Sequence, residues 1–231
     1  MKLYFSPGAC SFSPHIALRE AGVDFELVKV DLKNRKLAAN GGDYLAINPK
    51  GYVPVLELDN GERLSEGPAI VQYIADLKPE TGLAPKNGTL ARYRLQEWLS
   101  YINSEIHKGF GPLFNPATPE ETKAAARQNL AKRLDYVAAH LEKHAYLLGE
   151  QFTVADGYLF TVLRTDAAAA PPSRPHRPPR RPRTNPAIRR RARRIASQHI
   201  AVPTASPDIT NRPQELPCPN NPSSSFRTDH R

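Results

Sequence analysis

The stretch Ser6-Pro7-Gly8-Ala9-Cys10-Ser11-Phe12-Ser13-Pro14-His15 lies between a short apolar run and a helical pattern. The apolar run, Leu3-Tyr4-Phe5, predicts a strand, and the apolar spacing after Cys10 predicts a helix over residues 12–21. Cys10 therefore stands where a strand leads into the first turn of a helix. Unpaired N–H groups and the helix dipole favour an anion there, so we expect a reactive cysteine with a stabilised thiolate. The alternative is a small buried apolar residue, as most lone cysteines are.

Other polar groups flank this cysteine. Ser11 and Ser13 offer hydroxyls that would either cap the helix or hydrogen-bond the sulfur. His15 lies one helical turn beyond Cys10, and we expect it to be solvated rather than to act on the thiol.

Charge divides the chain into two parts. Residues 1–164 hold 19 Lys and Arg against 19 Asp and Glu, whereas residues 165–231 hold 13 Arg, no Lys and four acids. The second part also carries 13 of the 23 prolines and few large apolar residues, so we expect a disordered basic tail. Arginine without lysine, among alanine and proline, is typical of GC-rich DNA translated out of frame. We therefore hypothesise a frameshift near residues 164–170.

The composition also narrows the classes of function. Cys10 and Cys218 fall in different parts of the chain, so no disulfide framework is predicted. Neither a secretory signal nor a run of 18 apolar residues is recognisable, which predicts a cytoplasmic protein without a membrane partner. The arginine clusters of the tail would bind phosphates non-specifically. No aromatic residues are interleaved with them, so we expect no specific nucleic-acid partner.

Strand and helix patterns alternate over the first 80 residues. Residues 25–30 predict a second strand, and Asn60-Gly61 predicts a hairpin between strands over residues 54–58 and 63–64. Glu66-Gly67-Pro68 then opens a helix. This order predicts a small mixed sheet of four strands with helices on its faces.

Pro54 begins a strand that otherwise reads as central, although proline donates no hydrogen bond to a neighbouring strand. A cis bond between Val53 and Pro54 would turn the Val53 backbone outward, free to pair with an extended ligand. Because trans is the commoner form of any such bond, both forms stay open.

From Leu90 onward the pattern is purely helical. Apolar periodicity predicts helices over residues 90–110 and 118–144 and a third from Thr153. Thr118-Pro119-Glu120-Glu121 predicts a capping box for the second of these, and Thr153 with Asp156 predicts one for the third.

Two domains follow from these patterns: a mixed α/β domain over residues 1–80 and an all-α domain over residues 87–164. Gly157 stands where an apolar residue would pack on Phe152 at the start of the third helix, so we expect that start to be weakened.

Several of these motifs occur together in one known family. Over residues 1–164 the chain resembles bacterial glutathione S-transferases of the beta class. The motifs that carry the resemblance are Ser6-Pro7-Gly8-Ala9-Cys10-Ser11, Asn48-Pro49-Lys50-Gly51, Val53-Pro54, Glu66-Gly67, His107-Lys108-Gly109-Phe110 and Phe152-Thr153-Val154-Ala155-Asp156.

The resemblance implies a thioredoxin-like domain that binds glutathione, an all-helical domain that here lacks its last helices, and a homodimer. It implies that Cys10 sits against the glutathione sulfur and that the Val53 backbone meets the cysteinyl part of the ligand. The remaining implied contacts are Glu66 and Gly67 with the γ-glutamyl end, Arg35 near the glycyl carboxylate, His107 and Lys108 over the sulfur, and Glu105 reaching the partner subunit's site.

The function implied is transfer of glutathione to small hydrophobic electrophiles, a detoxification reaction with glutathione as co-substrate and with neither a cofactor nor a metal. One alternative is a thiol–disulfide or peroxide reductase that works through Cys10 alone, since Ser13 replaces the second cysteine of a C-x-x-C pair. Another is an inactive glutathione-binding product of the frameshift. The sequence does not name the electrophile.

Overall fold

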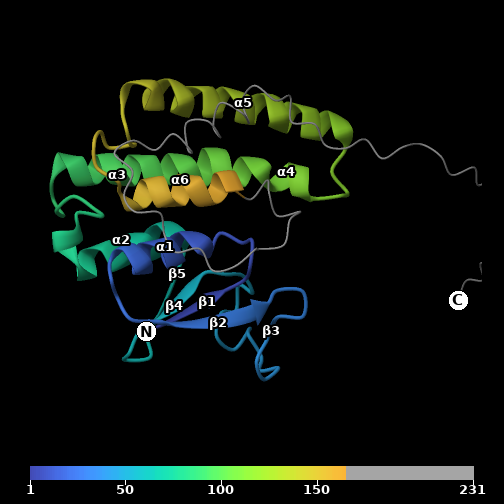
Figure 1. The fold of residues 1–231 in the computed structure, drawn as a ribbon. Helices are drawn as coiled ribbons and strands as arrows, with labels where there is room; N and C mark the ends of the chain where they lie inside the picture. The colour runs from blue at the N-terminus through green and yellow to red at the C-terminus, as the bar shows by residue number, and fades with distance from the viewer. Residues whose placement is uncertain (165–231) are drawn as a thin grey trace, which may run out of the picture. The chain divides into compact units, whose positions relative to one another are not determined.

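A mixed sheet of five strands begins the structure, a computed structural model that describes residues 1–164 (Figure 1). The spatial order is β3-β2-β1-β4-β5, with β1 and β2 parallel and the other neighbours antiparallel. The strands are β1 Lys2–Phe5, β2 Glu26–Asp31, β3 Lys36–Leu37, β4 Val55–Glu57 and β5 Arg63–Ser65.

The prediction of four strands is wrong by one. Lys36–Leu37 pairs antiparallel with Val30 and Asp31 and adds a short edge strand. Two residues in a polar segment show no alternation of apolar side chains, so the sequence pattern could not reveal this strand.

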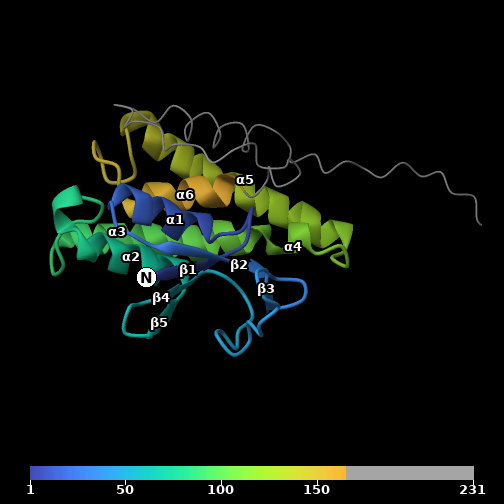
Figure 2. The ribbon, with the colours of Figure 1, turned by 60° about the horizontal axis from the view of Figure 1, so that its bottom comes forward.

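Alternate side chains of β1 and β4 pack into two separate apolar clusters on opposite faces of the sheet. Leu3 of β1 and Leu56 of β4 point to the face that carries α1 (Phe12–Glu20) and α2 (Gly67–Leu77). Tyr4 and Val55 point to the opposite face, where a smaller cluster forms around the fully buried Tyr44. Both ribbon views place α1 and α2 on the same side of the sheet (Figures 1 and 2). The period of two in the strands thus produces a sheet that is covered on both faces.

The rest of the described chain is helical, as predicted, although the segment from Leu90 is not one uniform helix. It is α-helical to Tyr101, then π-helical over Ile102–His107 and 3-10 helical over Lys108–Phe110. The α-helical part, Leu90–Tyr101, is α3. The other helices are a 3-10 turn at Pro79–Thr81, α4 Gly111–Phe114, α5 Glu120–Lys143 and α6 Val154–Arg164.

An ion pair between a buried arginine and a partly exposed aspartate joins α2 to α3. Arg92 is 3% exposed, and its guanidinium donates to both carboxylate oxygens of Asp76 and to the Pro85 carbonyl. Loss of the Asp76 carboxylate would leave the buried guanidinium without its counter-charge, so the pair helps to fix how the two helices meet.

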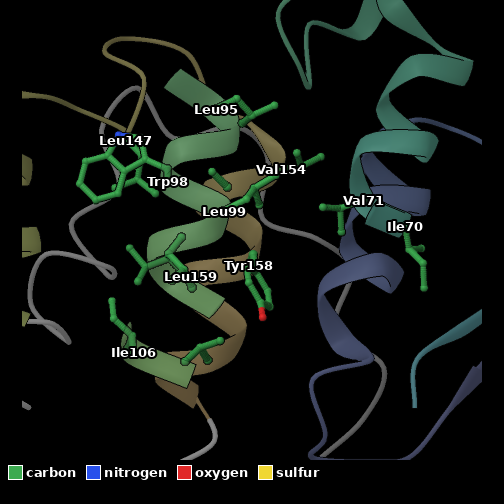
Figure 3. Packing of buried hydrophobic residues seen from close by; sticks show 14 of the residues in the cluster. Ile70, Val71, Leu95, Trp98, Leu99, Ile106, Leu147, Val154, Tyr158 and Leu159 are labelled. Atoms are coloured by element: carbon green, nitrogen blue, oxygen red, sulfur yellow. The ribbon is translucent and has the colours of Figure 1, made fainter. Parts of the chain in front are cut away.

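Helix α6 is the most deeply buried helix among the described residues. All its residues from Val154 to Leu163 except Phe160 are buried, and it packs against α1, α2 and α3. Figure 3 shows the side chains of α6 between those of α3 and those of α2. One continuous apolar cluster therefore runs from β1 through α1 and α2 to the helical domain.

The predicted capping box of α6 is confirmed. Asp156 accepts hydrogen bonds from the Thr153 N–H (2.9 Å) and hydroxyl (3.0 Å), and also from the Leu147 N–H (2.9 Å). Burial nevertheless raises the pKa of this carboxyl to about 6. Its role is structural, because every one of these donors is local backbone or cap.

The predicted capping box of α5 is wrong. Pro119 itself takes the cap position in extended backbone, and no side chain caps the helix there. Glu120 and Glu121 still lie in the first turn, where negative charge complements the helix dipole.

The predictions for residues 165–231 lie outside the described residues, including the disordered tail, the frameshift, the lost helices and the state of Cys218. Within residues 1–164, no helix has the length and apolar character needed to cross a membrane. The domain limits at residues 80 and 87 stay predictions.

We predict that Gly157→Ala stabilises the protein. A Cβ built on Gly157 would lie 3.5 Å from Ile16 Cγ2 and 3.6 Å from the Phe152 ring, which is ordinary contact. Alanine also lowers the backbone entropy of unfolding, so the free energy of unfolding should rise by about 0.5–1 kcal/mol in denaturant titrations.

Gly22→Ala is the matched control for this substitution. Its Cβ would meet nothing within 4 Å, but its φ of +65° is strained for alanine, so this variant should lose stability. Equal loss in both variants would contradict the packing assigned to Gly157.

Candidate active site

Cys10 lies in the turn between β1 and α1, held by local backbone bonds. The Ala9 N–H donates to the Ser6 carbonyl, and the Cys10 thiol donates to the Val53 carbonyl at 3.3 Å. The Val53–Pro54 peptide bond is cis. The structure thus brings Cys10 to the Val53 carbonyl, beside a peptide bond whose cis and trans forms the sequence analysis left open.

The serines beside Cys10 do not play the predicted roles. The Ser11 hydroxyl donates to the Ser6 carbonyl and accepts from the Ser6 N–H, both at 3.2 Å, so it closes the turn. The Ser13 hydroxyl is buried and has no hydrogen-bond partner among the described residues. His15 is half-buried, with its ring edge-on to Phe12 and Phe25 rather than solvated.

The expectation of a stabilised thiolate is wrong for this ligand-free structure. Burial raises the pKa of the Cys10 thiol, and this effect exceeds the opposing effects of nearby N–H groups and of the Lys108 charge. The helix N-terminus is present, but the loss of hydration outweighs it. Cys10 is therefore a protonated hydrogen-bond donor here.

Glu66 and Gly67 form the start of α2. Glu66 has a φ of +70° and stands at the cap position, with Gly67 as the first helical residue. The Glu66 carboxylate pairs with the Lys50 ammonium at 2.7 Å, and the same ammonium donates to the Ser65 hydroxyl at 3.0 Å. A negative group thus lies beside a helix N-terminus, so this corner could bind an ammonium and a carboxylate together.

His107 ends the π-helical segment and contacts Tyr158, which in turn contacts Asn103; the sequence analysis assigned neither of these two residues to the site. Its Nδ1 lies 3.0 Å from the Tyr158 hydroxyl, and that hydroxyl donates to Asn103 Oδ1 at 2.9 Å. Burial, followed by the charge of Lys108, lowers the pKa of His107.

Electrostatics place these groups near Cys10. Lys108 lowers the pKa of the Cys10 thiol. Burial raises the pKa of Tyr158, and Cys10, when ionised, and Glu66 raise it further. Six residues from both domains therefore share one region: Cys10, Glu66, Asn103, His107, Lys108 and Tyr158.

Tyr158 was missed because its spacing fits the apolar stripe of α6. The one available signal was its phenol hydroxyl, since a buried tyrosine usually has a hydrogen-bond partner. Asn103 gave no comparable signal.

Two predicted site residues make other contacts. Arg35 has a φ of +55° and its guanidinium lies over Gly51, where a Cβ would come within 2.5 Å of Nη1. Glu105 accepts from Arg133 of α5 at 3.0 Å and 2.9 Å. Its reach into a partner's site stays a prediction.

Comparison with known proteins identifies the family to which the chain belongs. Residues 8–77 match the family model for the N-terminal domain of glutathione S-transferase, and residues 101–176 match that for its C-terminal domain. Glutathione S-transferase GstA of Escherichia coli O157:H7 is 54% identical over 164 residues, which are 71% of this chain and 81% of that protein.

Two solved structures are also similar. A sphingomonad glutathione S-transferase complexed with glutathione is 54% identical, with a TM-score of 0.69 over 73% of this chain and 83% of that one. The bacterial beta-class enzyme of Sphingomonas chungbukensis is 45% identical, with a TM-score of 0.71 over 86% and 94%. This chain belongs to the glutathione S-transferase family.

We predict slow alkylation of Cys10 in the ligand-free chain at neutral pH. The thiol is protonated and donates to Val53, whereas the thiolate is the form that reacts with iodoacetamide. The rate should increase as pH rises through and beyond the usual range of a cysteine pKa. Peptide mass spectrometry would follow Cys10 separately from Cys218, and a fast rate that does not change with pH would contradict the protonated state.

Proposed function

We propose that this chain binds reduced glutathione beside Cys10 and joins it, through its sulfur, to small hydrophobic electrophiles. The observation that supports this most is the meeting of Cys10, the Val53 carbonyl, the start of α2 and Lys108 in one region. The relatives named as glutathione S-transferases, one of them solved with glutathione, support the same activity.

The site offers a partner for each part of the peptide. The Val53 backbone would pair with the cysteinyl residue of glutathione, because its N–H donates to no group in residues 1–164. Glu66 would take the γ-glutamyl ammonium, and the N–H groups at Gly67 would take the α-carboxylate. Arg35 would supply the positive charge for the glycyl carboxylate.

Ligand binding would release two contacts of the free chain. Lys50 now neutralises Glu66, so the ligand's ammonium would share or replace that ion pair. The thiol of Cys10 now occupies the Val53 carbonyl, and the cysteinyl N–H of glutathione would compete for it.

For conjugation, the glutathione thiol must lose its proton. Lys108 provides a positive charge that favours the thiolate, and His107 is a candidate proton acceptor because burial disfavours its charged form. The sulfur electron pair then forms a bond to the electrophilic carbon, and the leaving group departs with the electrons of the broken bond.

A reductase remains the rival function, since Cys10 lies at the entry of α1 next to the segment before Pro54. Ser13 replaces a second cysteine, so only a monothiol route through a mixed disulfide with glutathione is open. An inactive glutathione-binding chain is the third possibility. A homodimer with Glu105 at its interface, a cytoplasmic location and the absence of a cofactor belong to the proposal, as do domains over residues 1–80 and 87–164.

Binding is tested first with the full chain on immobilised glutathione, eluted with free glutathione. Specific retention is expected, and soluble protein that does not bind would contradict the proposed site.

Glu66→Gln should weaken the affinity for glutathione by roughly tenfold, because a charge-assisted contact to the ligand's ammonium is lost. Glu62→Gln is the matched control, since Glu62 is exposed and, within residues 1–164, its carboxylate accepts a hydrogen bond from the Asn60 side chain alone.

Cys10→Ala separates conjugation from reduction. We expect transfer to an aryl halide to persist at a reduced rate, because glutathione supplies the attacking sulfur. Reduction of a mixed disulfide should disappear, because Cys10 is then the required nucleophile. Loss of conjugation with retained glutathione binding would show that Cys10 carries the transfer itself.

A further inference from the structure

The hydroxyl of Tyr158 connects two residues of the π-helical segment. Asn103 and His107 lie four residues apart in this segment, and both contact the same hydroxyl oxygen. The ring comes from α6, the buried helix between the two domains, and lies on the side of α6 that faces α1 and α2 (Figure 3).

The hydrogen bonds determine which nitrogen of His107 carries the proton. Asn103 Oδ1 has no proton to give, so the Tyr158 hydroxyl donates to it. The hydroxyl oxygen is then left as an acceptor, and His107 Nδ1 must be the donor across the 3.0 Å contact. In a neutral imidazole this leaves the lone pair on Nε2.

We propose that Tyr158 is a positioning residue that holds His107 as the Nδ1–H tautomer and so presents Nε2 as the proton acceptor of the active site. This inference rests on the proposed transferase function. In this scheme Tyr158 contacts neither the glutathione thiol nor the electrophile, and it acts through His107.

Packing keeps the hydroxyl in place. Tyr158 is 2% exposed, and a Cβ built on Gly67 would lie 3.8 Å from its ring. The ring is therefore in contact distance of the start of α2, while its hydroxyl reaches the π-helical segment. The start of α2 thus supports the ring from the first domain, while both ends of the His107–Tyr158 contact belong to the helical domain.

The opposite tautomer would break this chain of bonds. With the proton on Nε2, the Nδ1 lone pair would face the hydroxyl oxygen, and Tyr158 could donate to only one of its two partners. The half-buried surroundings and the neighbouring Lys108 also disfavour the doubly protonated ring. The neutral Nδ1–H form is the one that satisfies all three groups.

In the reaction, the glutathione thiol proton moves to Nε2 and the ring becomes an imidazolium. Nδ1–H continues to donate to Tyr158 throughout, so no hydrogen bond has to rearrange. The thiolate pair forms the new carbon–sulfur bond, and Nε2 later returns its proton to the leaving group or to water. Such proton transfer by a positioned imidazole is general base catalysis.

The first test reads the tautomer directly, without turnover. Nitrogen-15 NMR of the full chain with labelled histidine should show the Nδ1–H form for His107, assigned by loss of its signals in His107→Gln. Tyr158→Phe should convert His107 to the Nε2–H form. An unchanged tautomer in Tyr158→Phe would overturn the inference, whatever the activity of the chain.

Two further pairs of variants control for folding. Asn103→Leu removes the acceptor for Tyr158 and should loosen the tautomer, whereas Asn103→Asp keeps an acceptor oxygen and should preserve it. Tyr101→Phe removes another tyrosine hydroxyl of the helical domain, one that donates to the Arg133 carbonyl, and should leave the His107 signals unchanged.

The second test is a double-variant cycle on turnover. Tyr158→Phe should lower kcat by about tenfold, part of what a general base supplies, with little change in KM for glutathione. In the His107→Gln background the same substitution should cost nothing further, because its effect passes through His107. An equal loss in both backgrounds would show that Tyr158 acts by another route. A chain that keeps the Nδ1–H tautomer but never turns over would contradict the transferase, not the tautomer assignment.

Discussion

The buried carboxylate of Asp156 is the constraint on which the helical domain depends. It binds the Thr153 backbone and hydroxyl at the start of α6 and the Leu147 N–H of the preceding loop. Since α6 is buried against α1, α2 and α3, fixing its first turn fixes the junction of the two domains. Tyr158 lies two residues after Asp156, so its position follows from that anchoring.

Sequence patterns predicted the strands and helices in which apolar residues recur with a regular period. The strand period identified β1, β2, β4 and β5, and the helical period identified the apolar faces of α5 and α6. Thr153 and Asp156 were predictable because a capping box is a local bond between residues three apart. The edge strand at Lys36–Leu37 was not, since its pairing depends on a distant partner and not on its own residues.

The grouping of the candidate site residues was predictable from motifs, whereas their protonation was not. Motifs placed Cys10, Glu66 and His107 near one another, and the structure brings Cys10, Glu66, Lys108 and His107 into one region. The prediction of a stabilised Cys10 thiolate was wrong because a helix N-terminus can be recognised in the sequence, whereas the depth of burial cannot. Asn103 and Tyr158 were absent from the expected set because their contact joins residues 55 positions apart.

Because Ile102–His107 is π-helical, the position of His107 depends on the number of residues in this segment. A π turn closes its hydrogen bond over one more residue than an α turn does, so it carries one residue beyond the regular helix. Loss of any residue in this stretch, even an apolar one, would rewind the segment and rotate His107 off the Tyr158 hydroxyl. The number of residues between Tyr101 and Lys108 is therefore a constraint on the contact between His107 and Tyr158.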